Sequence, residues 1–197
     1  PLTINHHNMF GLFNKKKEIK AVDCIYKTES AKYQALLQAL NGDHFIYLIY
    51  YFEDTRQQFL ELETQKNELN NNVKSNYKLI QANTLLSKLS IEKGTFIFLE
   101  HHPSFAIEQK IKQHLFETLS IESITFYTSL EDEILIKFGS DRIRVLLEKM
   151  GFQEDEKIEH QMITDSLIRA QQRIDEQVQY PSDTRMRKDW FILNPFQ

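Results

Sequence analysis

Apolar and polar residues alternate in blocks along the chain, and these blocks predict strands that alternate with helices. Four apolar runs rich in aromatic and β-branched residues have the composition of buried parallel strands, at residues 45–52, 77–82, 95–99 and 126–130. Other stretches have apolar residues at the i, i+3, i+4 and i+7 spacing of an amphipathic helix, as in Tyr33, Leu36, Leu37 and Leu40. This alternation predicts an α/β fold, with a small parallel sheet flanked by helices.

The last third of the chain predicts helices without further strands. Acidic residues at 131–133 suit the first turn of a short helix, because negative charge is favourable at a helix N-terminus. A second helix has one apolar face, formed by Ile143, Leu146, Leu147 and Met150. A third has a narrow heptad-like seam, formed by Ile163, Leu167, Ala170, Ile174 and Val178. We therefore expect a flexible N-terminal segment (1–20), an α/β domain (21–138) and a helical extension with an apolar tail (139–197).

Composition narrows the classes of function. Hydrophobic residues make up 41% of the 197 positions and charged residues 26%, which is the balance of a globular chain. The net charge of −4 provides no basic footprint, so we expect no nucleic-acid partner. Cys24 is the only cysteine, which excludes a disulfide framework and a cysteine metal site and favours a cytoplasmic location. No apolar run has the length of a membrane span.

The N-terminal segment contains a short apolar and basic cluster. Its apolar members Phe10 and Phe13 precede three lysines, Lys15, Lys16 and Lys17. Such a cluster could contact an anionic membrane surface peripherally, here the inner membrane, although it is too short to anchor the chain alone. The alternative is a mobile terminus, or one whose phenylalanines pack on the fold.

An ordered series of motifs lies within residues 126–175. It reads F-Y-T-S-L-E-D-E-I, F-G-S-D-R-I, L-E-K-M-G, I-E-H-Q-M-I-T and R-A-Q-Q-R-I. This series resembles SecA, the motor ATPase of bacterial preprotein export, strongly over about 124–178. There it follows the second nucleotide-binding domain and leads into the helical scaffold. A weaker resemblance over about 45–123 includes the stretch from Gly94 to Glu108. The resemblance implies a RecA-like or P-loop-helicase-like fold.

The residues that handle phosphate in SecA are replaced in this chain. The family has Q-L-R-G-R-S-G-R-Q-G-D, and its arginines fall on Lys112, His114 and Glu117 here. Arginine binds phosphate oxygens as a planar, permanently charged fork, which none of these three side chains reproduces. The chain also has no G-x-x-x-x-G-K-[ST] phosphate loop. We therefore expect a degenerate nucleotide-binding domain without ATP or another cofactor, and Lys112 is the one candidate phosphate contact.

Glu100, His101 and His102 follow the predicted strand at 95–99 and form a candidate catalytic or metal site. Ligands of open α/β sheets bind beyond the carboxyl ends of the strands, which places this triplet at a suitable edge. The alternative is a structural role, because adjacent histidines on a short loop point in different directions and no further ligand has the spacing of a metal site. We therefore expect no metal.

Candidate contacts with a protein partner lie in the helical extension. Arg142 and Arg144 could pair with a partner or form an ordinary exposed helix face. The seam with Ile163, Leu167 and Ile174 could be a docking stripe or could pack on the chain's own sheet. Trp190, in the apolar tail, could anchor a partner or pack back on the body.

These observations predict a non-catalytic, SecA-related protein-interaction module, accessory to preprotein export or regulating it. A first alternative is a nucleotide-binding component that completes an ATP site with a partner chain. A second alternative is a small enzyme that uses Glu100, His101 and His102.

Overall fold

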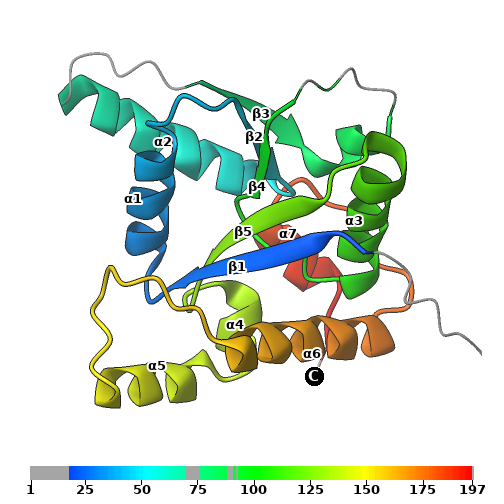
Figure 1. Ribbon diagram of the computed structural model, residues 1–197. Helices are drawn as coiled ribbons and strands as arrows, with labels where there is room; N and C mark the ends of the chain where they lie inside the picture. The colour runs from blue at the N-terminus through cyan, green and yellow to red at the C-terminus, as the bar shows by residue number, and fades with distance from the viewer. Residues whose placement is uncertain (1–17, 70–75, 88–90, 92, 197) are drawn as a thin grey trace, which may run out of the picture.

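The computed structural model describes residues 18–69, 76–87, 91 and 93–196. Its centre is a five-stranded, all-parallel sheet with the strand order β1-β5-β4-β2-β3 (Figure 1). The strands are β1 (Lys20–Tyr26), β2 (Ile46–Tyr50), β3 (Tyr77–Gln81), β4 (Thr95–Phe98) and β5 (Ser123–Ser129). The predicted α/β class with a parallel sheet is therefore confirmed.

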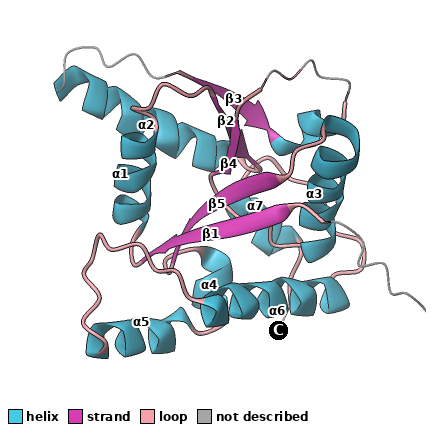
Figure 2. Cartoon of the chain, viewed as in Figure 1, coloured by secondary structure: helices cyan, strands magenta, loops and turns pink. Residues whose placement is uncertain are grey.

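Helices cover both faces of the sheet (Figure 2). One face packs against α1 (Glu29–Ala39) and α2 (Glu53–Leu69), and the other against α3 (Phe105–Leu119) and α6 (Gln161–Gln177). A 3-10 helix, η1 (Ala82–Leu86), joins β3 to β4. Three shorter helices complete the described chain: α4 (Glu133–Lys137), α5 (Ser140–Lys149) and α7 (Arg187–Leu193).

The strand order creates a topological switch point between the carboxyl ends of β2 and β4, which we call the crevice. β2 leads into α2 on one face, whereas its neighbour β4 leads into α3 on the other face. Right-handed crossovers place successive helices on opposite faces when the chain reverses its direction across the sheet. The loops after β2 and β4 therefore diverge, and this is the position at which open α/β sheets bind their ligands.

Several elements differ from the sequence prediction. β1 and α7 were not predicted, and β5 begins three residues earlier than the apolar run at 126–130. The helices of the extension do not stand apart from the sheet, since α6 and α7 share its hydrophobic core. Phe10, Phe13, Lys15, Lys16 and Lys17 lie outside the described residues. Within the described residues, no helix has both the length and the apolar character required to cross a membrane.

Candidate functional site

Glu100 closes the crevice between β2 and β4 through its carboxylate. Its side chain is fully buried, and Oε1 accepts hydrogen bonds from the backbone N–H groups of Tyr51 and Phe52, each at 3.0 Å. The hydroxyl of Thr55, in the first turn of α2, donates to Oε2. Glu100 thus joins the end of β4 to the end of β2 and the start of α2. A carboxylate that accepts three bonds has little capacity left for a ligand.

Arg187 of α7 lies over the same crevice and supplies its positive charge. Its Nη1 is 3.4 Å from Asp132 Oδ2 and 3.8 Å from Glu100 Oε2. Its backbone N–H donates to the Asp54 carboxylate at 3.2 Å. Burial raises the pKa of Glu100, and the positive charge of Arg187 opposes that shift. Burial alone would lower the pKa of Arg187, but Asp132 and Glu100 outweigh it and raise that pKa, so the guanidinium stays charged.

His102 provides the aromatic surface on which the tail packs. The Trp190 ring meets it edge to face at a centroid distance of 5.7 Å, and Phe52 stacks on it at 5.6 Å. Its Nδ1 accepts the backbone N–H of Ser104, the residue that caps α3, at 2.9 Å. Burial lowers the pKa of His102 to about 4, so the ring is neutral at pH 7. The imidazole therefore serves the packing of α7.

His101 is directed away from the crevice and lies between two carboxylates. Nδ1 is 2.9 Å from Glu108 Oε2, while Nε2 is 3.5 Å from Asp23 Oδ1, a distance that suits an ion pair better than a hydrogen bond. The ring stacks on Phe126 at 4.1 Å. Burial alone would lower the pKa of His101, but Glu108 and Asp23 raise it to about 10. The structure therefore contains a buried imidazolium that joins β1, the end of β4 and α3.

Glu108 extends this network to α6 and to the candidate phosphate contact. Gln171 of α6 donates from Nε2 to Glu108 at 3.0 Å and to the His102 carbonyl at 2.7 Å. Lys112, one turn along α3, approaches Glu108 Oε1 at 3.3 Å. Asp23 and Glu108 carry two negative charges, and His101 and Lys112 carry two positive charges. The network is therefore electrically balanced by this chain's own side chains.

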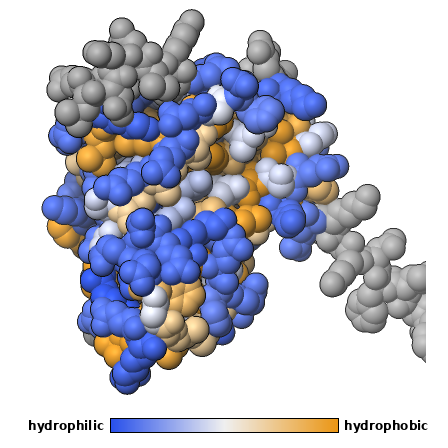
Figure 3. Space-filling model, turned by 60° about the vertical axis from the view of Figure 1, so that its left-hand side comes forward, coloured by the Kyte–Doolittle hydropathy of each residue, from blue (hydrophilic) through white to orange (hydrophobic). Residues whose placement is uncertain are grey.

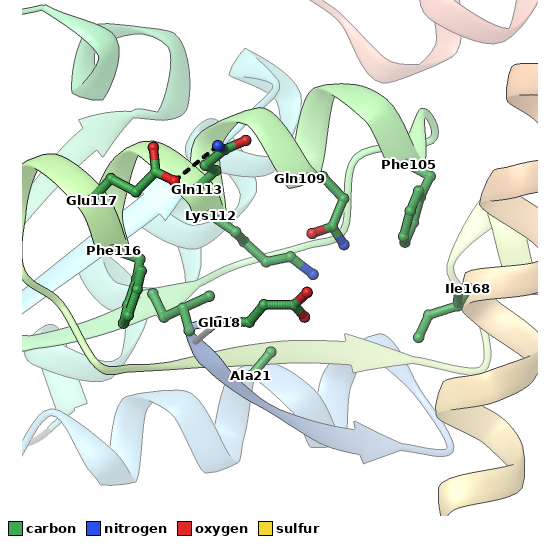
Figure 4. A pocket seen from close by; sticks show the side chains of 10 residues that line it. Glu18, Ala21, Phe105, Gln109, Lys112, Gln113, Phe116, Glu117 and Ile168 are labelled. Atoms are coloured by element: carbon green, nitrogen blue, oxygen red, sulfur yellow. Dashed lines mark hydrogen bonds between the residues drawn. The ribbon is translucent and has the colours of Figure 1, made fainter. Parts of the chain in front are cut away.

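A pocket of about 390 Å³ lies between β1, α3 and α6 (Figure 4). Phe105 and Phe116 stand towards its two ends, and Lys112 and Glu18 are both directed into it. An adjoining pocket of about 460 Å³ shares Lys112 and includes His101 in its lining. Across the described residues, no group of three histidine, cysteine, aspartate or glutamate side chains could hold a metal ion.

The structure separates the residues that the sequence offered as one site. Glu100 and His102 belong to the crevice, whereas His101 joins the network with Lys112 on the other side of the β4–α3 loop. The other two positions of the family's arginines face neighbouring side chains of α3: His114 is 3.3 Å from the Thr118 hydroxyl, and Glu117 accepts from Gln113 at 3.0 Å.

The candidate partner contacts divide into exposed and buried groups. Arg142 is exposed on α5, and Arg144 is half-buried with Nη2 at 3.8 Å from Glu131. The remaining four are buried and at most 1% exposed, namely Ile163, Leu167, Ile174 and Trp190. We therefore correct their assignment from partner contacts to core residues: the α6 seam packs on the chain's own sheet and Trp190 packs back on the body.

Sequence reasoning missed the partners that give the triplet its role. Asp23, Glu108, Gln171 and Arg187 come from four different elements, two of which were not predicted. One local signal was available for Glu108, which is the fourth residue after the capping Ser104 and therefore faces the loop that precedes α3.

Comparison with known proteins identifies relatives of part of the chain. No family model matches it. The SecA subunit of the protein translocase from Chloroherpeton thalassium is 40% identical over 85 residues, which are 43% of this chain and 8% of the relative. The SecA of Halothermothrix orenii is 42% identical over 76 residues, covering 39% and 9% of the two chains. The SecA of Bacteroides thetaiotaomicron is 39% identical over 77 residues, covering 39% and 7%.

This chain contains a SecA-related region. The matched part covers less than half of the chain and less than a tenth of each relative. The SecA-related region is therefore a small section of a much longer protein in those organisms.

Proposed function

We propose that the chain is a SecA-related protein-interaction module that serves preprotein translocation through contacts and not through ATP chemistry. The observation that carries this proposal is the crevice at the carboxyl edge of β2 and β4. Glu100, Arg187 and Trp190 occupy it with side chains of this chain. The compartment we propose is the cytoplasm.

The side chains at the positions of the family's arginines support the absence of ATP chemistry. Lys112 pairs with Glu108, and Glu117 would repel a phosphate. None of the side chains offers the forked, charged donor that stabilises a transferring phosphoryl group. The alternative of an enzyme built on the triplet is disfavoured, because Glu100 accepts three hydrogen bonds and His101 lies in a balanced charge network.

The chemical part of the proposal is tested by assaying ATP hydrolysis by the purified chain. The Lys112→Met variant separates true activity from a contaminant, and Lys110→Met is the matched control because Lys110 is an exposed lysine of the same helix. We expect the wild type and both variants to show no ATP hydrolysis above the rate measured in buffer alone. Hydrolysis that disappears only in Lys112→Met would overturn the proposal.

The partner is tested separately, with complete SecA from Bacteroides thetaiotaomicron. We expect a complex by biolayer interferometry and no heat from ATP or ADP in calorimetry, with or without SecA. Nucleotide heat that develops only when SecA is present would favour the alternative in which the two chains complete an ATP site. If no complex forms, the link to translocation through this motor is wrong, whatever the ATPase result.

A further inference from the structure

The pocket between β1, α3 and α6 contains opposite charges that do not pair with each other. Exposed apolar residues do not single out a ligand site, since Figure 3 shows them at several places among the polar residues of one face. The pocket of about 390 Å³ differs, because polar side chains converge in it between aromatic ones (Figure 4). A hollow with apolar walls and a few convergent polar groups is the usual form of a small-molecule site.

One stripe of α3 and a small residue of β1 shape this pocket. The stripe shares one face of the helix, because its members follow one another at spacings of four, three and four residues: Phe105, Gln109, Lys112 and Phe116. The two phenylalanines are eleven residues apart, which is about 16 Å along the helix axis. Ala21 of β1 lies opposite the stripe, and its methyl group is too small to fill the space. The pocket is therefore elongated, with an aromatic ring towards each end.

Three polar side chains are directed into the middle of the pocket. Lys112 has three N–H donors, of which one is directed to Glu108 at 3.3 Å, so two remain for a ligand. Gln109 makes no hydrogen bond to another described residue, and Glu18 makes neither a hydrogen bond nor an ion pair to one. The Lys112 ammonium and the Glu18 carboxylate therefore face the same space without pairing.

The class of ligand follows from these two charges. An anion would be attracted by Lys112 and repelled by Glu18, and a cation would meet the reverse. An α-amino acid carries a carboxylate and an ammonium on one carbon atom, so its head group can pair with both side chains at once. The Gln109 amide can accept a hydrogen bond from the ammonium or donate one to the carboxylate. Phe105 and Phe116 each offer a ring against which an aromatic side chain can pack.

We propose that this pocket binds a free α-amino acid with an aromatic side chain, whose carboxylate pairs with Lys112 and whose ammonium pairs with Glu18. This inference goes beyond the proposed function, since it concerns a site remote from the crevice and needs no protein partner. For a ligand of the size of phenylalanine, the binding energy per atom that is typical of small ligands gives a dissociation constant on the order of 1 mM.

Calorimetric titration of the full chain tests the pairing of the head group, with L-phenylalanine and three probes that each lack one of its groups. Phenethylamine lacks the carboxylate, 3-phenylpropanoate lacks the ammonium, and glycine lacks the ring. We expect each of these three to bind about tenfold more weakly than L-phenylalanine. Equal binding of phenethylamine or 3-phenylpropanoate would overturn the assignment to an amino acid. Absence of L-phenylalanine binding at about 20 mM, well above the expected dissociation constant, would overturn the site itself.

Substitutions assign each end of the head group. Glu18→Gln should weaken binding of L-phenylalanine about tenfold and should not weaken 3-phenylpropanoate, because that probe has no ammonium. Lys112→Met should weaken L-phenylalanine by a similar factor and should not weaken phenethylamine, because that probe has no carboxylate. Glu122→Gln is the matched control, since Glu122 is an exposed glutamate that does not line the pocket, and it should leave all four titrations unaltered.

Far-UV circular dichroism shows whether each variant is folded. Lys112→Met also removes a partner of the buried Glu108, so Glu18→Gln decides the outcome if the lysine variant fails to fold. Glu18 is exposed, and its replacement by an amide of the same size leaves the core intact. Binding of L-phenylalanine that is the same in wild type and Glu18→Gln would overturn the proposal.

Discussion

Substitution of His101 should show how much the buried charge network contributes to the free energy of unfolding. The imidazolium lies between Asp23 and Glu108, whose side chains are 7% and 3% exposed. His101→Gln removes the positive charge and retains a polar side chain, so two carboxylates remain buried with Lys112 as their nearest cation. Removing one partner of a buried ion pair costs about 3–5 kcal/mol. With a urea m value of about 2 kcal/mol/M, the unfolding midpoint should fall by about 2 M.

The stabilisation that His101 provides should depend on pH, because the pKa of His101 differs between the folded and unfolded states. The folded protein holds a proton on His101 up to a pKa of about 10, whereas the unfolded chain releases it near 6.5. The stabilisation is therefore complete below about pH 6.5 and declines as the pH rises towards 10, by at most about 1.4 kcal/mol per pH unit. The free-energy gap between wild type and His101→Gln should consequently narrow between pH 6.5 and 9.5.

At acidic pH the two carboxylates give the opposite dependence, so that the free energy of unfolding falls as the pH is lowered. Burial alone would raise the pKa of Asp23 and of Glu108, but the hydrogen bonds and positive charges around them, foremost those of His101, together lower both pKa values. Their stabilisation is present above the ordinary pKa values of 3.8 and 4.5 and is lost as the pH falls through the lower folded values. Wild type should therefore lose stability below about pH 4 more steeply than a His101→Gln, Asp23→Asn double variant.

Urea unfolding followed by far-UV circular dichroism at several pH values measures both effects. His44→Gln is the matched control, because His44 is exposed, and it should leave the pH profile unchanged. Adding Asp23→Asn to His101→Gln should recover part of the loss, since it removes one uncompensated carboxylate, although Asp23→Asn alone destabilises. A gap that is below 1 kcal/mol, or that stays constant from pH 6.5 to 9.5, would refute the charge-network reasoning.

Three further substitutions test packing and backbone conformation by urea unfolding. Trp190→Ala should cost about 3–5 kcal/mol, because the ring is 1% exposed and packs on His102; a cost below 1 kcal/mol would mean that the tail contributes little to the folded body. Gly139→Ala should cost about 1–2 kcal/mol, because φ is +94° before α5 and a side chain is strained there; an unchanged midpoint would contradict this. Thr28→Ala should cost about 1 kcal/mol, since Thr28 Oγ1 caps α1 through the Ala31 N–H, and Thr64→Ala on the surface of α2 provides the comparison.

Uniform burial makes a strand recognisable from its own sequence, as β2 shows. β2 is buried at every position, so its apolar run identifies it without knowledge of its neighbours. β1 is different, because its pattern contains Lys20 and Asp23 and its first four residues are not buried. Asp23 is tolerated in the strand because His101 pairs with its charge and the Thr164 hydroxyl donates a hydrogen bond to it, and both residues lie far away in sequence. A local pattern cannot show a compensation that depends on distant residues.

The candidate site was predicted in position and not in chemistry, for the same reason. The end of the strand at 95–99 correctly placed Glu100, His101 and His102 at the carboxyl edge. Their roles depend on Arg187 and Trp190, which follow a proline-containing segment and looked like an apolar tail. Since α7 has only seven residues, its position is set by burial and ion pairing and not by helix propensity.

The proposed function requires a partner surface made of side chains that the core does not use. The α6 seam and Trp190 are buried, and the crevice between β2 and β4 contains Glu100 and Arg187. A partner that docked on any of these would have to unfold part of the chain first, at a cost comparable with the stability of the domain. The exposed side of α5 imposes no such cost, because Arg142, Val145 and Glu148 are accessible in the folded state. If the chain acts through protein contacts, α5 is therefore the surface at which contact-directed substitutions should be made first.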